Sequence, residues 1–136
     1  MGIMLVYDVT NEKTLDNISR WLGYIDEHAT PGVQRIIVGN KCDLTHERQV
    51  TREQGEGMAR AHGDVNFTEV SAKQGVGVEK SFVMLAESIL RKNMEEDERR
   101  SVETTSPMLV RHGGGRRSVK RLRNNVRNIK MVNCKI

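Results

Sequence analysis

The chain has 136 residues, which is enough for one ordinary domain. Its composition, 37% hydrophobic and 29% charged, is globular and excludes a chain that is disordered throughout. The formal net charge of +4 is unevenly spread, because nine basic residues and no acidic residue lie between Arg111 and the C-terminus. Residues 1–110 therefore carry the difference between +4 and +9, a net charge of −5, and the basic character belongs to the tail.

Cysteine usage and the N-terminus favour a cytoplasmic protein. Cys42 and Cys134 are too few for a disulfide framework, and no Cys/His spacing is typical of a zinc site. The apolar run at residues 3–7 is too short for a signal peptide or a membrane span. Myristoylation after Gly2 would need Ser or Thr at the position of Val6. The sequence predicts neither secretion nor an N-terminal lipid.

The N-terminal third predicts a strand followed by a helix. Residues 3–7 form a nearly continuous apolar run, which is typical of a strand buried on both faces of a parallel sheet. Pro31 and Gly32 end the helix that follows. Its apolar residues recur at helical spacing and predict that Trp21 belongs to the core: Leu15, Ile18, Trp21, Leu22, Ile25 and Ala29.

The middle of the chain repeats this order. Residues 36–39 predict a second buried strand that runs into the polar loop 40–43, where Cys42 is expected to be a small buried side chain. Thr51 and Gln54 have the spacing of a capping box, so a short helix is expected to begin there and to end near Gly63.

A third unit completes the pattern. Residues 65–70 predict a strand that leads into the polar segment 71–73. Strands that alternate with helices predict an α/β fold, here three βα units of a partial doubly wound parallel sheet. Ligands of such sheets bind beyond the carboxyl ends of the strands, so both polar loops are expected to face one site. The last helix is predicted from Val78, Phe82, Leu85, Ala86, Ile89 and Leu90.

The first polar loop has the residues needed to read guanine. Guanine presents an adjacent N–H and NH₂ on one edge, and an ionised Asp43 would accept both while adenine is rejected. Asn40 would tie the two loops together and meet the purine edge, while the stem of Lys41 would lie over the base.

The second polar loop would complete the base site. The backbone N–H of Ala72 would donate to the guanine carbonyl, Ser71 would fix the loop, and Lys73 would cover the opposite face of the base. The alternative reading is that both loops are ordinary polar turns closing two strands. Their combination in this order, with a helix between them, favours the guanine site.

These loops match the N-K-x-D and S-A-K motifs, so the chain resembles the Ras-superfamily small GTPases. Residues 1–10, M-G-I-M-L-V-Y-D-V-T, look like a signature of the Rab branch, and D-N-I before Trp21 is similar to the Rab helix that follows it. The resemblance covers residues 1–93 and implies the fourth to sixth strands of the GTPase domain. It implies GTP or GDP as ligand, Rab-type effectors or regulators as partners, and guanine-nucleotide-switched control of vesicle traffic.

The groups that would handle phosphates are missing from this chain. No G-x-x-x-x-G-K-[ST], no D-x-x-G-Q and no switch Thr occur, so the chain alone lacks a magnesium site and the catalytic elements of GTP hydrolysis. Base contacts alone predict weak or absent nucleotide binding, with a Kd on the order of millimolar. The family's first strand, which would lie beside the strand at Ile3, is also missing, so an open apolar edge predicts marginal stability unless something pairs there.

Residues 94–136 are predicted to form a hypervariable basic tail, disordered or helical, beyond a domain at residues 1–93, and the charged segment just after Asn93 is predicted to be a linker or disordered. Apolar residues at spacings of three and four, interleaved with Lys and Arg, suggest a basic amphipathic helix for an anionic membrane surface. Calmodulin-like grooves, nucleic acid without predicted specificity, and a merely solvated tail stay open. Cys134 is third from the end rather than fourth, so prenylation is unsupported. The apolar positions are Val119, Leu122, Val126, Ile129 and Val132.

The sequence predicts no catalytic residue and no metal ligand. Its four histidines stand singly, without the Cys, Ser or Asp neighbours that catalysis would need: His28, His46, His62 and His112. The leading hypothesis is a shortened Rab-type GTPase product found in the cytoplasm or at the cytosolic face of membranes. The alternatives are a non-catalytic interaction module that uses the tail, and a fragment without a function of its own.

Overall fold

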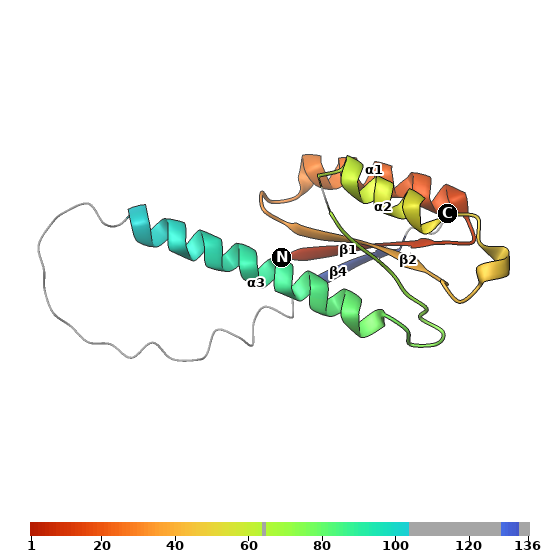
Figure 1. Ribbon diagram of the computed structural model, residues 1–136. Helices are drawn as coiled ribbons and strands as arrows, with labels where there is room; N and C mark the ends of the chain where they lie inside the picture. Colours follow the sequence, from red (N-terminus) through yellow and green to blue (C-terminus); the bar gives the residue numbers. More distant parts are fainter. Residues whose placement is uncertain (64, 104–128, 134–136) are drawn as a thin grey trace, which may run out of the picture.

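The computed structural model describes residues 1–63, 65–103 and 129–133, which form one parallel sheet with helices on both faces (Figure 1). The sheet has the order β3-β2-β1-β4, and the strands are β1 (Gly2–Asp8), β2 (Gln34–Asn40), β3 (Asn66–Glu69) and β4 (Ile129–Asn133). Each neighbouring pair is parallel. The α/β class and the partial doubly wound sheet predicted from the sequence are confirmed.

Strand β1 lies inside the sheet and is buried on both of its faces. Ile3, Leu5 and Tyr7 belong to one apolar cluster, whereas Met4 belongs to the other. Successive side chains of a strand point to opposite faces, so an unbroken apolar run serves two cores at once. This is why the run at the N-terminus has no polar alternation.

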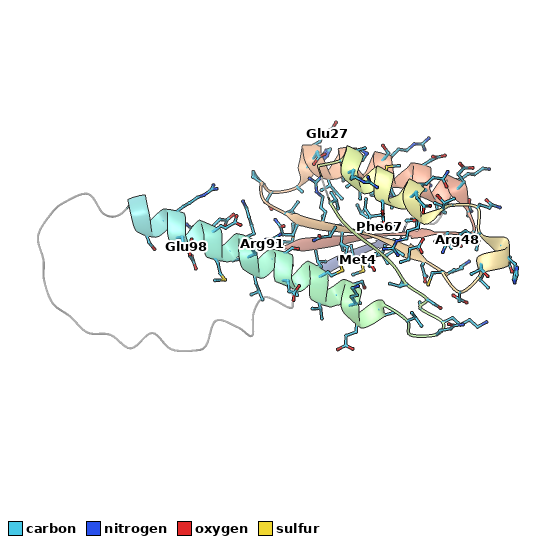
Figure 2. The ribbon with its side chains drawn as sticks, viewed as in Figure 1. Met4, Glu27, Arg48, Phe67, Arg91 and Glu98 are labelled. Atoms are coloured by element: carbon cyan, nitrogen blue, oxygen red, sulfur yellow. The ribbon has the colours of Figure 1, made fainter. Side chains whose placement is uncertain are left out.

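The helices α1 (Glu12–His28) and α2 (Arg52–Ala61) cover one face of the sheet, and α3 (Val78–Glu103) covers the other (Figure 1). The α1 residues Leu15, Ile18 and Leu22 pack in the same cluster as Leu5 of β1. On the opposite face, the α3 residue Leu85 packs in the cluster of Met4, which Figure 2 labels. Helices on both faces are what a parallel sheet needs, because each face would otherwise be exposed to water.

Local signals in the sequence explain where the first two helices begin. Asn11 caps α1 by accepting a hydrogen bond from the Lys13 amide at 3.2 Å. The predicted capping box of α2 is confirmed, since the Thr51 hydroxyl accepts from the Gln54 amide and the Gln54 side chain accepts from the Thr51 amide. A short 3-10 helix, η1 (Thr45–Glu47), precedes α2.

Two of the burial predictions are wrong. Trp21 is 40% exposed because the buried stripe of α1 runs through Ile18, Leu22 and Ile25, which leaves Trp21 at the edge of that stripe. There it meets Tyr24 edge to face, with ring centroids 6.1 Å apart. Cys42 is only partly buried, because it lies in the loop after β2 rather than within the strand.

The tail prediction is corrected in two places. Helix α3 continues through residue 93 to Glu103, so the charged segment expected to be a linker is helical there. Residues 129–133 form the strand β4, where a helical or disordered tail was predicted. Residue 64 and residues 104–128 and 134–136 of the tail lie outside the described residues. The basic amphipathic helix predicted for the tail falls largely on them. No helix in the described ranges is long and apolar enough to cross a membrane.

Candidate functional site

The two predicted loops emerge side by side at the carboxyl ends of β2 and β3. The first follows Asn40, the last residue of β2, and the second begins two residues after Glu69, the last residue of β3. Backbone hydrogen bonds join them at their base, since the Val70 amide donates to the Gly39 carbonyl at 2.8 Å and the Cys42 amide donates to the Val70 carbonyl at 3.1 Å. The site therefore lies where parallel sheets bind ligands.

Asn40 ties the two loops together. Its Oδ1 accepts the Lys41 amide at 2.8 Å and the Ala72 amide at 3.1 Å, so one side-chain oxygen holds both loops. This is the linking role expected of Asn40. It also occupies the Ala72 N–H that was expected to donate to the guanine carbonyl, so base recognition there requires the N–H to be shared or exchanged.

Lys41 is held in a defined conformation by its backbone and by an ion pair. Its φ of 68° lies in the left-handed region, which a non-glycine residue rarely adopts. Its Nζ pairs with the Asp8 carboxylate, at the end of β1. Backbone strain of this kind persists only where the surrounding structure compensates for it, and it is often found at functional sites.

Asp8 is a site residue that the motif analysis missed. Its carboxylate accepts the Thr10 amide at 2.9 Å and the Thr10 hydroxyl at 2.7 Å, in addition to the ion pair with Lys41. Although partial burial opposes the effect, the hydrogen bonds from Lys41 and Thr10 hold the pKa of the Asp8 carboxyl below its ordinary value. The hydrogen bond to Asp8 raises the pKa of Lys41. The rule that ligands bind beyond strand ends would have indicated Asp8, because it ends β1 as Asn40 ends β2.

Asp43 is partly buried, and no side chain among the described residues donates a hydrogen bond to its carboxylate. The Leu44 amide donates to the Lys41 carbonyl at 3.0 Å and closes the turn around it. A carboxylate on a closed turn with unoccupied lone pairs is suited to accept two parallel N–H donors.

The second loop is rigid at its base and open at its tip. Ser71 is 1% exposed, accepts the Gln74 amide on its Oγ at 3.1 Å, and forms a two-bond bridge with Val76. Gly77 has a φ of 72° and lies so close to the chain that an added Cβ would be 2.9 Å from the Glu69 carbonyl oxygen. Ala72 and Lys73 are exposed at the tip. The structure thus brings the loop of Lys73 beside that of Asn40.

An ion pair beneath the first loop was also not predicted. Arg48 donates to both oxygens of Glu69, at 2.6 and 3.1 Å, and to the Val50 carbonyl at 3.0 Å (Arg48 is labelled in Figure 2). Side-chain hydrogen bonding to Glu69 raises the pKa of Arg48. Because this pair joins β3 to the segment before α2, it supports the floor of the site. The spacing of residues in the sequence does not predict this ion pair, because Arg48 and Glu69 come from different elements.

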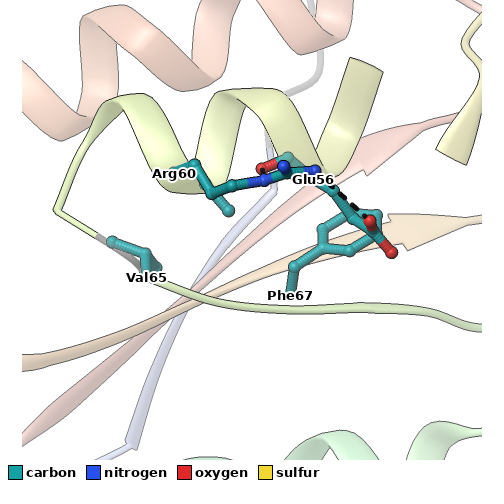
Figure 3. A pocket seen from close by; sticks show the side chains of 5 residues that line it. Glu56, Arg60, Val65 and Phe67 are labelled. Atoms are coloured by element: carbon teal, nitrogen blue, oxygen red, sulfur yellow. Dashed lines mark hydrogen bonds and ion pairs between the residues drawn. The ribbon is translucent and has the colours of Figure 1, made fainter. Parts of the chain in front are cut away.

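A separate hollow of about 270 Å³ lies between α2 and β3, away from these loops (Figure 3). Glu56 and Arg60 line it and pair with each other at 3.6 Å, while Phe67 and Val65 contribute apolar surface. Its two charged groups neutralise each other, so it offers no convergent polar set for a nucleotide. In the ranges that the structure describes, no group of three or more His, Cys, Asp or Glu residues could hold a metal ion.

The parallel sheet and the two linked loops at its carboxyl edge are those of an α/β domain of the small-GTPase type. A family model described as the Ras family matches residues 1–91, well over half of the chain. The chain therefore belongs to the Ras family.

The relatives are of the Rab type. "Ras-related protein Rab-10" of Caenorhabditis elegans is 50% identical over 108 residues, which cover 79% of this chain and 53% of the relative. "Ras-related protein Rab-8" of Diplobatis ommata is 51% identical over 92 residues, covering 68% and 43%. "Ras-related protein Rab-8B" of Homo sapiens is 46% identical over 111 residues, covering 81% and 53%. The chain thus spans about half the length of the curated relatives it matches.

Proposed function

We propose that this chain carries the guanine-recognition half of a Rab-type nucleotide site. The single observation that supports it best is the Asn40 Oδ1, which binds the Lys41 amide at 2.8 Å and the Ala72 amide at 3.1 Å and so aligns both guanine-reading loops. In this proposal Asp43 accepts the N–H and NH₂ of the base, Lys41 and Lys73 cover its two faces, and Ser71 holds the second loop. The ligand is GTP or GDP.

The proposal does not include hydrolysis by this chain alone. Phosphoryl transfer depends on a phosphate-cradling loop and a bound magnesium ion, and the sequence has no G-x-x-x-x-G-K-[ST] to supply them. Base contacts without phosphate contacts support a Kd on the order of millimolar, or about 4 kcal/mol. Nucleotide-switched control of vesicle traffic, with Rab-type effectors, is the function proposed for the whole protein.

Purine discrimination tests the base site. Xanthine carries a carbonyl where guanine carries NH₂, so GDP fits the wild-type Asp43 and XDP fits Asp43→Asn, whose amide can donate. We expect an NMR titration of the wild-type chain to shift the amide resonances of residues 40–43 and 71–73 with GDP rather than XDP. The variant should reverse this preference by tenfold or more, the value of one hydrogen bond to a charged group. Equal shifts with both nucleotides in both proteins would refute the base site.

We also propose that the basic tail attaches the chain reversibly to anionic membrane surfaces at the cytosolic side. The nine basic residues from Arg111 onward support this, since each Lys or Arg near an anionic bilayer contributes about 1 kcal/mol. Flotation with vesicles containing phosphatidylserine should recover the chain at low salt and lose it at high salt. Recovery with neutral vesicles to the same extent would contradict an electrostatic attachment.

A non-catalytic interaction module is the second candidate. The observation that favours it is the pairing of β4 with β1. With this pairing the chain's own tail completes the sheet, so a folded surface for partners does not depend on a phosphate loop or a bound nucleotide. A folded chain that fails to respond to any purine nucleotide in the titration above would support this candidate over the first.

A further inference from the structure

Strand β4 lies at the one place where the sequence predicted an open edge. It pairs with β1 in parallel over five register positions, from Gly2↔Ile129 to Val6↔Asn133. The resemblance to small GTPases gives this same edge to the first strand of the family. We propose that the β1 edge is a strand-acceptor site, that the chain's own segment Ile129–Asn133 fills it, and that this pairing maintains the fold of the chain as a monomer.

The properties of β1 show why it needs a partner on this side. Leu5 and Ile3 are buried on one face and Met4 on the other, so β1 is an interior strand by its side chains. Its pairing with β2 satisfies only one edge of β1. Without a second neighbour, half of the β1 amides and carbonyls would lack ladder partners beside two apolar cores, an arrangement that promotes pairing with other chains.

The segment that fills the edge differs in composition from its surroundings. Residues 111–128 are rich in Arg, Gly and Asn, whereas Ile129, Met131 and Val132 are apolar and two of them are β-branched. Lys130 and Asn133 interrupt the run and keep it from being a long hydrophobic strand. A short strand with a charged residue is how soluble proteins limit further pairing at a sheet edge.

The tether favours the chain's own tail over a second copy. Helix α3 ends at Glu103, fourteen residues past the buried Ile89, or about 21 Å along the helix axis. Residues 104–128 can span at most roughly 80 Å when extended, which is ample for the return to the sheet. A tethered segment has an effective concentration on the order of millimolar, so it outcompetes a second copy present at micromolar concentration.

A proline in β4 of the full chain tests the proposal. Met131→Pro removes the amide at the middle of the strand and hinders the ladder, and Val119→Pro is the matched control elsewhere in the tail. We expect Met131→Pro to lower the midpoint of thermal unfolding by about 10 °C or more, whereas Val119→Pro leaves it within about 2 °C. Hydrogen exchange of the β1 amides should accelerate at least tenfold in Met131→Pro alone.

If Met131→Pro folds poorly, a separate peptide that supplies the β4 strand to this variant keeps the test decisive. A synthetic peptide of residues 127–136 should restore slow exchange to the β1 amides of that variant, and the same peptide with the proline should not. Unchanged unfolding and unchanged β1 exchange in Met131→Pro would overturn the proposal. A wild-type dimer whose β1 protection rises with protein concentration would overturn it as well, because the strand would then come from a second copy.

Discussion

Two glycines of α2 are expected to respond in opposite directions to the same substitution. Gly55 and Gly57 both lie inside the helix, where Ala is favoured over Gly by about 1 kcal/mol. Nothing lies within 4 Å of a Cβ added at Gly57. A Cβ added at Gly55 would be 2.5 Å from the Tyr7 hydroxyl and 2.7 Å from the ring of Phe67. Such distances require the helix or the ring to move.

The magnitudes follow from these surroundings. Gly57→Ala should stabilise the chain by about 0.5–1 kcal/mol, through helix propensity alone. Gly55→Ala gains the same propensity but overpacks the contact between α2 and the sheet, which costs about 1–3 kcal/mol. Its net effect is therefore a destabilisation of about 0–2.5 kcal/mol, and the two variants should differ by about 1–3 kcal/mol.

Urea unfolding followed by circular dichroism measures both variants under one condition. The difference corresponds to the slope m times the shift in midpoint, and the slopes should agree between variants. Two equal stabilisations would refute the close packing of α2 against Tyr7. The double variant Gly55→Ala with Tyr7→Phe provides an internal check, because removal of the hydroxyl should recover part of the loss.

Three further predictions concern buried and site polar groups. Among the described residues the buried Tyr7 hydroxyl has no hydrogen-bond partner, and burial raises the pKa of the phenol. Tyr7→Phe should therefore stabilise the chain by about 1 kcal/mol and remove a loss of stability above pH ~10, checked by thermal unfolding against Tyr24→Phe. The folded pKa of Asp8 is lowered, so its contribution is present above its unfolded value of 3.8 and is lost as pH falls through the folded pKa; Asp8→Asn should flatten that acid limb in unfolding measured from pH 6 to 2. Asn40→Ala removes the acceptor of two amides and should speed hydrogen exchange at Ala72 about fivefold or more, whereas unchanged exchange would contradict its linking role.

Most of the sheet and its helices could be predicted because the sequence patterns that specify them are local. Continuous apolar runs predicted the first two strands, and the capping box of Thr51 and Gln54 predicted the start of α2. The link between the two polar loops was predictable from chain order, since neighbouring parallel strands place their following loops together. Asn40 then had a partner within reach in the second loop.

The failures have non-local or ambiguous causes. Trp21 and Leu22 lie three and four residues after Ile18, so helical spacing alone allows both to be buried. The orientation of α1 against the sheet decides that Leu22 is buried and Trp21 is not. The charged segment after residue 93 has the composition of a linker, but Glu and Arg are also good helix formers and α3 continues through it. Its Ser101 hydroxyl donates to the Asp97 carbonyl at 2.8 Å, a contact within the helix itself.

The prediction for β4 failed for a further reason. Ile129 and Val132 fit a helical spacing with the apolar residues before them, so the local pattern favoured a helix. What selects the strand is the unpaired edge of β1, which lies more than a hundred residues away in the sequence. Tertiary context therefore overrode local pattern at this point, as it commonly does for short strands.

The position of β4 also connects the tail to the proposed nucleotide site. Asp8 ends β1 and holds Lys41, while β1 itself is held between β2 and β4. β4 pairs with Gly2–Val6, two residues before Asp8, so its loss should loosen that part of β1 and, through the strand, the position of Asp8. In Met131→Pro we expect faster exchange at the Thr10 amide, which donates to the Asp8 carboxylate at 2.9 Å.

The loop after β2 should respond less to that change. The Val70 amide, which donates to the Gly39 carbonyl at 2.8 Å, joins β2 to the end of β3 and does not depend on β1. Its exchange should stay within about twofold of wild type while that of Thr10 rises tenfold, a difference of about 1 kcal/mol in local stability. Equal acceleration at both amides would mean that β4 acts only through the stability of the domain as a whole, as the strand-acceptor proposal allows, and the selective coupling of tail and Asp8 would then be wrong.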